Sequence, residues 1–188
     1  MTTREAPISI DQFEAFLARP ENRDRRFELI DGEISEKTMP TREHGIISAK
    51  FVHLMMVYFE AHPEREAQVA VEARHRPTGD AGNDRIPDVS VVLGKRPIET
   101  YGTADYLPDI CIEVQSPDDS LRMMREKARF YIANGAKYAV NVLPAQRAIE
   151  TYAADGSEAL LTGDDVLSFG DLLPGFAVPV RRFFPDTV

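Results

Sequence analysis

Two stretches decide the fold: Pro87-Asp88-Val89-Ser90-Val91-Val92-Leu93 and Pro108-Asp109-Ile110-Cys111-Ile112-Glu113-Val114-Gln115-Ser116. Both are rich in β-branched residues and follow a proline, which is typical of strands. If they pair as antiparallel neighbours that fold about Thr100 and Tyr101, Asp88 falls opposite Glu113. Residues directly opposite each other lie ~4.5–5.5 Å apart at Cα and point to the same sheet face. This register therefore predicts two adjacent carboxylates.

The same register gives the strand pair one apolar face. Its members alternate along both strands: Val89, Val91, Leu93, Ile110, Ile112 and Val114. Ser90 and Val92 share the opposite face with Cys111 and Gln115. We expect a helix to cover the apolar face. The strand pairing that buries the aliphatic residues is thus the same pairing that brings the two acids together.

Helices and strands are predicted on both sides of this pair. Ser9 and Gln12 have the spacing of a capping box, which indicates a short helix that ends before Pro20. Asp31-Gly32 favours a type I′ turn between strands at 26–30 and 33–38. Apolar residues at three- and four-residue intervals predict the longest helix over 41–61.

Further elements are expected downstream. They are a strand at 68–74, a mobile polar loop at 78–84, a helix at 119–133, a strand pair at 137–143 and 149–152, and strand character around 173–175. Central strands between helices predict an α/β fold, with a mixed β-sheet flanked by α-helices and preceded by a helix and a β-hairpin. We expect one domain over 1–188, with its core at about 10–180.

Composition excludes several protein classes. The chain has 188 residues, 43% of them hydrophobic, and a chain of this size can bury about 70% of its unfolded surface. Pro and Gly number 13 and 11, too few for a collagen-like or disordered chain. No apolar run approaches the roughly 18 residues of a membrane span. The single Cys111 and a start without a signal-peptide pattern favour a cytoplasmic location.

The charge constrains the partners. The formal net charge is −9, which repels a polyanion at long range and argues against tight, sequence-blind binding to nucleic acid. Salt screens exposed charges beyond about 8 Å, so a local basic patch still decides what a docked phosphate meets. Net charge alone therefore leaves nucleic acid open as a partner.

Two opposed acids suggest a metal site. Like charges at close range disfavour joint ionisation, and a divalent cation removes this conflict. Mg²⁺ is typically held by one or two carboxylates together with waters and substrate phosphates. Each acid alone also has an ordinary explanation, because Asp88 can simply begin a strand and Glu113 can face water.

A series of short motifs runs along the chain. They are Phe27-Glu28-Leu29-Ile30-Asp31-Gly32-Glu33, Glu43-His44-Gly45, Pro87-Asp88, Glu113-Val114-Gln115-Ser116-Pro117, Glu126-Lys127 with Tyr131, and Leu173-Pro174-Gly175-Phe176. In order and spacing they resemble the putative restriction endonuclease family of bacterial proteins, assigned to the PD-(D/E)xK nuclease superfamily. The likeness runs from about residue 10 to 180.

The resemblance implies a restriction-endonuclease-like fold and a Mg²⁺-dependent nuclease site, at which Mn²⁺ is expected to substitute. Asp88 and Glu113 would be metal ligands, with the carbonyl oxygen of Val114 as a third. One position departs from the superfamily pattern, which has a lysine two residues after the second acid. Here that residue is Gln115, which carries no charge. Gln115 and Ser116 are therefore expected only to support the site.

Lys127 is the candidate replacement for the missing lysine. It lies on the edge of the apolar stripe of its predicted helix, three residues after Met124 and four before Tyr131. A lysine stem along apolar surface can carry the ammonium into a cleft, although an ordinary surface lysine fits the same position.

Glu28 and His44 complete the candidate catalytic set, since both belong to the family pattern. Glu28 could reach the metal through water, and His44 could orient water or phosphate. Each also has a structural alternative, as a hairpin surface residue and a packing residue. Zinc is not expected, because His44, His53 and His62 lie nine residues apart and no His-Glu-x-x-His motif occurs.

The predicted function is therefore a metal-dependent endonuclease that hydrolyses phosphodiester bonds of nucleic acid, with DNA as the expected substrate, a homodimer as the expected assembly and no membrane partner. The net charge and Gln115 keep a second hypothesis open, a non-catalytic nucleic-acid-associated or interaction protein that retains the nuclease fold. A third hypothesis is a metal-dependent phosphoesterase acting on a small nucleotide.

Overall fold

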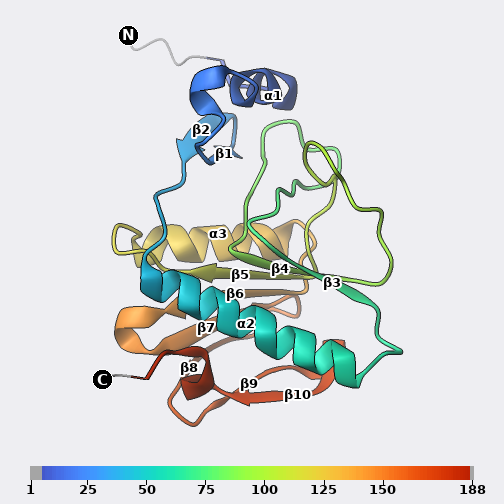
Figure 1. Ribbon diagram of the computed structural model, residues 1–188, viewed down its shortest axis with the longest axis vertical. Coiled ribbons are helices and arrows are strands. Elements are labelled where there is room, and N and C mark those ends of the chain that lie inside the picture. Colours follow the sequence, from blue (N-terminus) through green and yellow to red (C-terminus); the bar gives the residue numbers. More distant parts are fainter. Residues whose placement is uncertain (1–5, 187–188) are drawn as a thin grey trace. The chain divides into compact units, whose positions relative to one another are not determined.

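The computed structural model describes residues 6–186, which divide into two compact units (Figure 1). The first unit contains the chain up to Met39 together with Arg74–Ile86 and Ile98–Leu107. The second contains Pro40–Ala73, Pro87–Pro97 and the chain from Pro108 onward. The expectation that both units act as one domain stays a prediction. No helix among the described residues is long and apolar enough to cross a membrane.

The first unit begins with the predicted helix and hairpin. Helix α1 (Ile10–Leu17) has the complete capping box of Ser9 and Gln12. Strands β1 (Phe27–Ile30) and β2 (Glu33–Glu36) pair antiparallel around Asp31 and Gly32. Both turn residues have positive φ, 50° and 79°, as a type I′ turn requires. These predictions are confirmed.

The polar tract 78–84 is more ordered than the sequence analysis expects. The amide of Gly32 donates to the carbonyl of Gly82 at 2.8 Å, and Leu29 and Asp84 exchange two backbone hydrogen bonds at 2.9 Å. The Asp84 side chain is fully buried against Arg74. Burial raises the pKa of Asp84 although Arg74 opposes the shift. Such dense hydrogen bonding does not support the expected mobility, because mobile loops have few buried contacts.

The second unit is built on a six-stranded mixed sheet in the order β3-β4-β5-β6-β7-β8. Its strands are β3 (Ala67–Val71), β4 (Val89–Leu93), β5 (Ile110–Val114), β6 (Tyr138–Leu143), β7 (Ala148–Ala153) and β8 (Glu158–Thr162). Only the β5–β6 pair is parallel. The mixed sheet confirms the predicted α/β fold class. The edge strand β8 was not predicted, because its short and largely exposed sequence lacks apolar alternation.

The central strand pair has the predicted register. Val89 lies opposite Ile112 and Val91 opposite Ile110, so the next step along both strands places Asp88 opposite Glu113. The apolar face formed by this register belongs to the main hydrophobic core. Burial of the aliphatic residues therefore fixes the pairing of the two acids.

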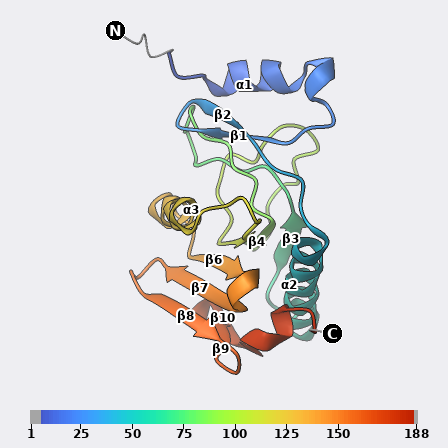
Figure 2. The ribbon, with the colours of Figure 1, turned by 90° about the vertical axis from the view of Figure 1, so that its left-hand side faces the viewer.

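Helices cover both faces of this sheet (Figures 1 and 2). Helix α2 (Arg42–Ala61) packs Ile47, Phe51 and Met55 onto the apolar face, together with the hairpin of β9 (Val166–Phe169) and β10 (Leu173–Pro179). Helix α3 (Leu121–Ala133) lies on the other face, and its buried residues are Met124, Ala128 and Tyr131. Short 3₁₀ turns complete the chain at Pro20–Asn22, Pro144–Gln146, Gly170–Leu172 and Val180–Phe183.

Candidate active site

Asp88 lies immediately before β4 and is 4% exposed. Its Oδ2 accepts a hydrogen bond from the amide of Val114 at 2.8 Å and lies 2.9 Å from Nε2 of His44. Thr41 caps α2 and accepts from the amide of His44, which places this histidine in the first helical turn. If Asp88 is ionised, it can only accept, and Nε2 of His44 is then the donor of this hydrogen bond.

Glu113 lies on β5 and is 6% exposed. Two side chains of α3 reach its Oε1: the hydroxyl of Tyr131 at 2.7 Å and the ammonium of Lys127 at 2.8 Å. Lys127 and Tyr131 are four residues apart, so one face of α3 presents both groups to the sheet. The Lys127 side chain is 17% exposed, and its role in catalysis stays a prediction.

The two carboxylates are thus compensated by the protein itself. Asp88 has an amide and a histidine, and Glu113 has a hydroxyl and an ammonium. Mutual repulsion of the two acids therefore no longer indicates a metal ion by itself, because these donors already offset the repulsion. The case for a metal rests instead on the kind of ligand atoms present.

Those ligand atoms suit a hard cation. Within residues 6–186 no group of three or more His, Cys, Asp and Glu side chains is arranged to hold a metal ion. Two carboxylates therefore form the candidate set, as is typical of Mg²⁺ sites completed by waters and substrate phosphates. Cys111 lies on the same face but is fully buried, and burial raises the pKa of its thiol well above the usual value.

Gln115 and Ser116 are hydrogen-bonded within the turn that leads into α3, and their supporting role at the site stays a prediction. The side-chain amide of Gln115 donates to the carbonyl of Asp119 at 2.9 Å. The amide of Ser116 donates to Oδ2 of the same aspartate, also at 2.9 Å. Gln115 thus holds the connection between β5 and the helix that carries Lys127.

Glu28 belongs to the first unit. It is 5% exposed, and its Oε1 accepts a hydrogen bond from the amide of Ile86 at 2.7 Å. The alternative of an exposed hairpin residue is therefore wrong. A role for Glu28 at the metal stays a prediction.

Two polar residues near Glu113 were not anticipated as site residues. Tyr131 was named in the family motif and on the apolar stripe of its helix but given no role in the site, yet its hydroxyl binds the carboxylate. Asn141 lies beside Glu113 in the parallel register of β5 and β6 and is 1% exposed. One signal was available in the sequence, since Asn141 is the single polar side chain among the aliphatic residues Ala139–Leu143.

Comparison with known proteins gives the family of this chain. A crystal structure described as a putative nuclease belonging to DUF820, from Anabaena variabilis, has the same fold with a TM-score of 0.77. It is 24% identical, and the match covers 95% of this chain and 98% of that one. No curated protein matches the chain. Residues 13–181 match the model of the Uma2 family, described as "Putative restriction endonuclease", and the chain therefore belongs to this family.

Proposed function

We propose that this protein is a metal-dependent endonuclease that hydrolyses phosphodiester bonds in DNA. The observation that carries the proposal is the grouping of Asp88, Glu113 and Lys127, in which an ammonium lies 2.8 Å from the second of two adjacent carboxylates. Two acids and one cation beside a scissile phosphate are the groups that such hydrolysis needs. Membership of a family described as restriction endonucleases supports the same reaction.

Asp88 and Glu113 would hold Mg²⁺ or Mn²⁺ by their carboxylates, with the carbonyl oxygen of Val114 as a third ligand. The ion, when bound, would polarise a phosphoryl oxygen and lower the pKa of a water molecule. The residues around the carboxylates have separate tasks. His44 orients Asp88, and Tyr131 orients Glu113, as partners of metal ligands commonly do.

Lys127 would stabilise the negative charge that accumulates on the phosphoryl oxygens during hydrolysis. The superfamily lysine two residues after the acid would perform this task from the strand. In this chain Gln115 occupies that position and is hydrogen-bonded to Asp119. The cation therefore comes from α3, whose packing over β5 brings it to the same carboxylate.

A cleavage assay with a matched control tests the proposal. We expect labelled duplex DNA to be cut with Mg²⁺ or Mn²⁺ and to remain intact in EDTA. Asp88→Asn should abolish both Mn²⁺ binding, measured by titration calorimetry, and cleavage. Glu126→Gln removes an exposed carboxylate on α3 and should change neither. Full cleavage by Asp88→Asn would refute the proposed site.

The alternative of a non-catalytic protein has one observation in its favour. Gln115 is fixed by a hydrogen bond to the backbone, so the strand supplies no cation to the site. The same assay separates the two functions. Mn²⁺ bound at Asp88 without cleavage of duplex DNA, single-stranded DNA or RNA would favour the non-catalytic protein, and cleavage of small phosphodiesters alone would favour the phosphoesterase.

A homodimer and a cytoplasmic location also stay predictions. Cutting both strands of a duplex at one place usually needs two active sites, which a symmetric dimer would supply. Sedimentation analysis of the metal-free protein, with and without duplex DNA, measures the oligomeric state directly.

A further inference from the structure

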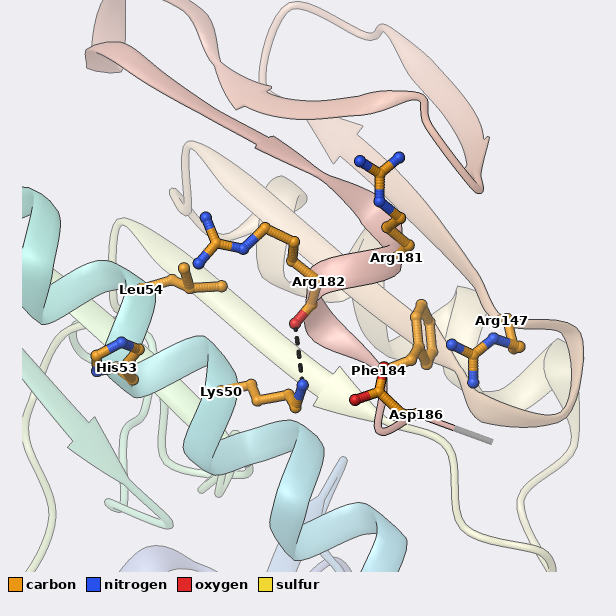
Figure 3. Close-up of a pocket in the computed structure, with 8 residues that line it drawn as sticks. All are labelled: Lys50, His53, Leu54, Arg147, Arg181, Arg182, Phe184 and Asp186. Atoms are coloured by element: carbon orange, nitrogen blue, oxygen red, sulfur yellow. Dashed lines mark hydrogen bonds between the residues drawn. The ribbon is translucent and has the colours of Figure 1, made fainter. Parts of the chain in front are cut away.

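The second unit contains a basic pocket of about 400 Å³ away from the paired carboxylates (Figure 3). Its polar lining residues are Lys50, His53, Arg147, Arg181, Arg182 and Asp186. Four cationic side chains and one carboxylate thus line the pocket, in a chain whose net charge is −9, and one of the four, Arg181, also forms an ion pair with Asp164. Such a concentration of positive charge calls for a functional explanation, because like charges held together repel each other.

Three separate elements contribute these cations. Lys50 and His53 are three residues apart and lie on one face of α2. Arg147 comes from the turn between β6 and β7, where it adopts a left-handed conformation with φ 47°. Arg181 and Arg182 belong to the 3₁₀ turn Val180–Phe183. Convergence of sequence-distant cations indicates a built site rather than a charged run along one helix.

Packing holds part of the pocket rigid. The guanidinium of Arg147 lies 5.3 Å from the centre of the buried Phe184 ring and donates to the carbonyl of Pro185 at 3.0 Å. The ammonium of Lys50 donates to the carbonyl of Arg182 at 3.4 Å (Figure 3). A guanidinium has five N–H donors and an ammonium three, so these contacts leave capacity for an anionic ligand.

The pocket lies at the same end of the sheet as the candidate active site. Strands β5 and β6 are parallel and pair Val114 with Val142. The end of β5 that carries Glu113 and the turn after β6 that carries Arg147 therefore lie at the same end of the sheet. Helix α2 contributes His44 to one site and Lys50 to the other. Six helical residues span about 9 Å, which is the axial rise of roughly three nucleotides of a DNA strand.

We infer that this pocket binds the phosphate backbone of nucleic acid a few nucleotides from the scissile bond. The inference rests on the proposed function and assigns its substrate a second contact surface. Cations from three elements present several donors over one open pocket, which suits consecutive phosphodiesters better than a single small anion. The pocket is also a local basic surface, which a protein with a net charge of −9 needs in order to bind a polyanion.

Binding can be measured without cleavage. Fluorescence anisotropy with a labelled 16-base-pair duplex in EDTA would compare the parent with Lys50→Met/Arg182→Gln. We expect affinity to fall about 10- to 100-fold at low salt, and the slope of log K against log salt to decrease by about 2, since each lost phosphate contact contributes roughly 0.9. Lys95→Met/Arg122→Gln removes two well-exposed cations of the same unit and should bind as the parent does.

The outcomes separate this inference from the proposed function. Loss of binding by the pocket variant supports the pocket even if the parent cuts nothing. Parental binding by that variant overturns the inference even if the parent cuts DNA efficiently. Failure of the parent to bind any duplex or single strand also overturns it. If the pocket binds inorganic phosphate or a mononucleotide but the pocket variant binds duplex DNA as the parent does, the inference is overturned as well. Far-UV circular dichroism confirms that each variant is folded.

Discussion

At the residue scale, the site depends on which element supplies one positive charge. The position two residues after Glu113 is occupied by Gln115, whose amide binds the carbonyl of Asp119. Lys127 supplies the ammonium from α3 at 2.8 Å from Glu113. The cation beside Glu113 thus comes from a helix and not from the strand that carries the acid.

The first prediction concerns this ammonium. Lys127→Met keeps most of the side-chain stem and removes the charge, so it should lower the single-turnover cleavage rate by roughly 10²–10³-fold, as loss of one charge-stabilising group does. Lys95→Met is the control, because Lys95 forms an exposed ion pair with Glu66 and should cut at the parental rate. A Lys127→Met protein with the parental rate would remove Lys127 from the mechanism.

A second variant in the Lys127→Met background tests the relocation itself. Gln115→Lys restores a cation on the strand, and we expect it to recover part of the lost rate. Recovery should be incomplete, because the new side chain starts from the turn that Gln115 now stabilises, and a displacement of even about 1 Å costs rate. No recovery, with metal affinity intact, would show that the strand position cannot serve this chain.

At the element scale, two well-buried carboxylates of the sheet form ion pairs with α3, beside the half-exposed pair of Arg129 and Glu158. Lys127 binds Glu113 on β5, and Arg125 binds Glu150 on β7 through its Nε at 3.0 Å. The hydroxyl of Tyr152 also donates to Glu150, at 2.9 Å. Burial by itself raises the pKa of Glu150, but the hydrogen bonds from Arg125 and Tyr152 outweigh burial and hold that pKa below the usual value.

This lowered pKa predicts how stability depends on pH. A carboxyl whose pKa is lower in the folded state than in the unfolded state stabilises the protein above its unfolded pKa, here about 4.5, and loses this contribution as the pH falls through its folded pKa. Glu150→Gln should therefore cost about 1 kcal/mol at pH 7 and less at pH 3.5. Urea unfolding at both pH values measures the difference.

Glu158→Gln provides the control for that comparison. Glu158 lies on the neighbouring strand and forms only a half-exposed ion pair with Arg129, so its replacement should change stability by less than about 0.5 kcal/mol. An equal cost of Glu150→Gln at pH 7 and pH 3.5 would contradict the assigned role of Glu150.

Most elements were predictable because their signals are local. The capping box at Ser9, the positive-φ turn at Asp31-Gly32 and the aliphatic alternation at Val89–Leu93 each encode one conformation in a few residues. The approach of Asp88 to Glu113 followed from the same alternation together with antiparallel pairing about Thr100 and Tyr101, which places the aliphatic residues of both strands on one face.

The remaining site contacts were not predictable because they join elements distant in sequence. The hydrogen bond of Tyr131 to Glu113 depends on how α3 is rotated over β5, and the contact of His44 with Asp88 depends on where α2 begins relative to the sheet. Helical periodicity defines which residues share a face but not which polar end meets which carboxylate. The basic pocket, built from three elements, is still less visible in the sequence.

At the scale of the whole molecule, the two compact units are interleaved in sequence. The chain passes between them five times, near residues 39, 73, 86, 97 and 107. Neither unit is a continuous segment, so neither can be obtained by cutting the chain once. Because ordering one unit fixes the ends of the segments that form the other, the connectivity favours a single cooperative unfolding transition.

Hydrogen exchange can test this cooperativity with a mild core variant. Ile112 is fully buried on β5 in the second unit, and Ile112→Val should destabilise the protein by roughly 0.5–1.5 kcal/mol. If the chain unfolds as one domain, the slowest-exchanging amides of the first unit, expected at Leu29 and Asp84, should lose protection by the same free energy as those of β5. Unchanged protection in the first unit beside lower protection in β5 would mean that the two units unfold independently, and the prediction of one domain would then be wrong.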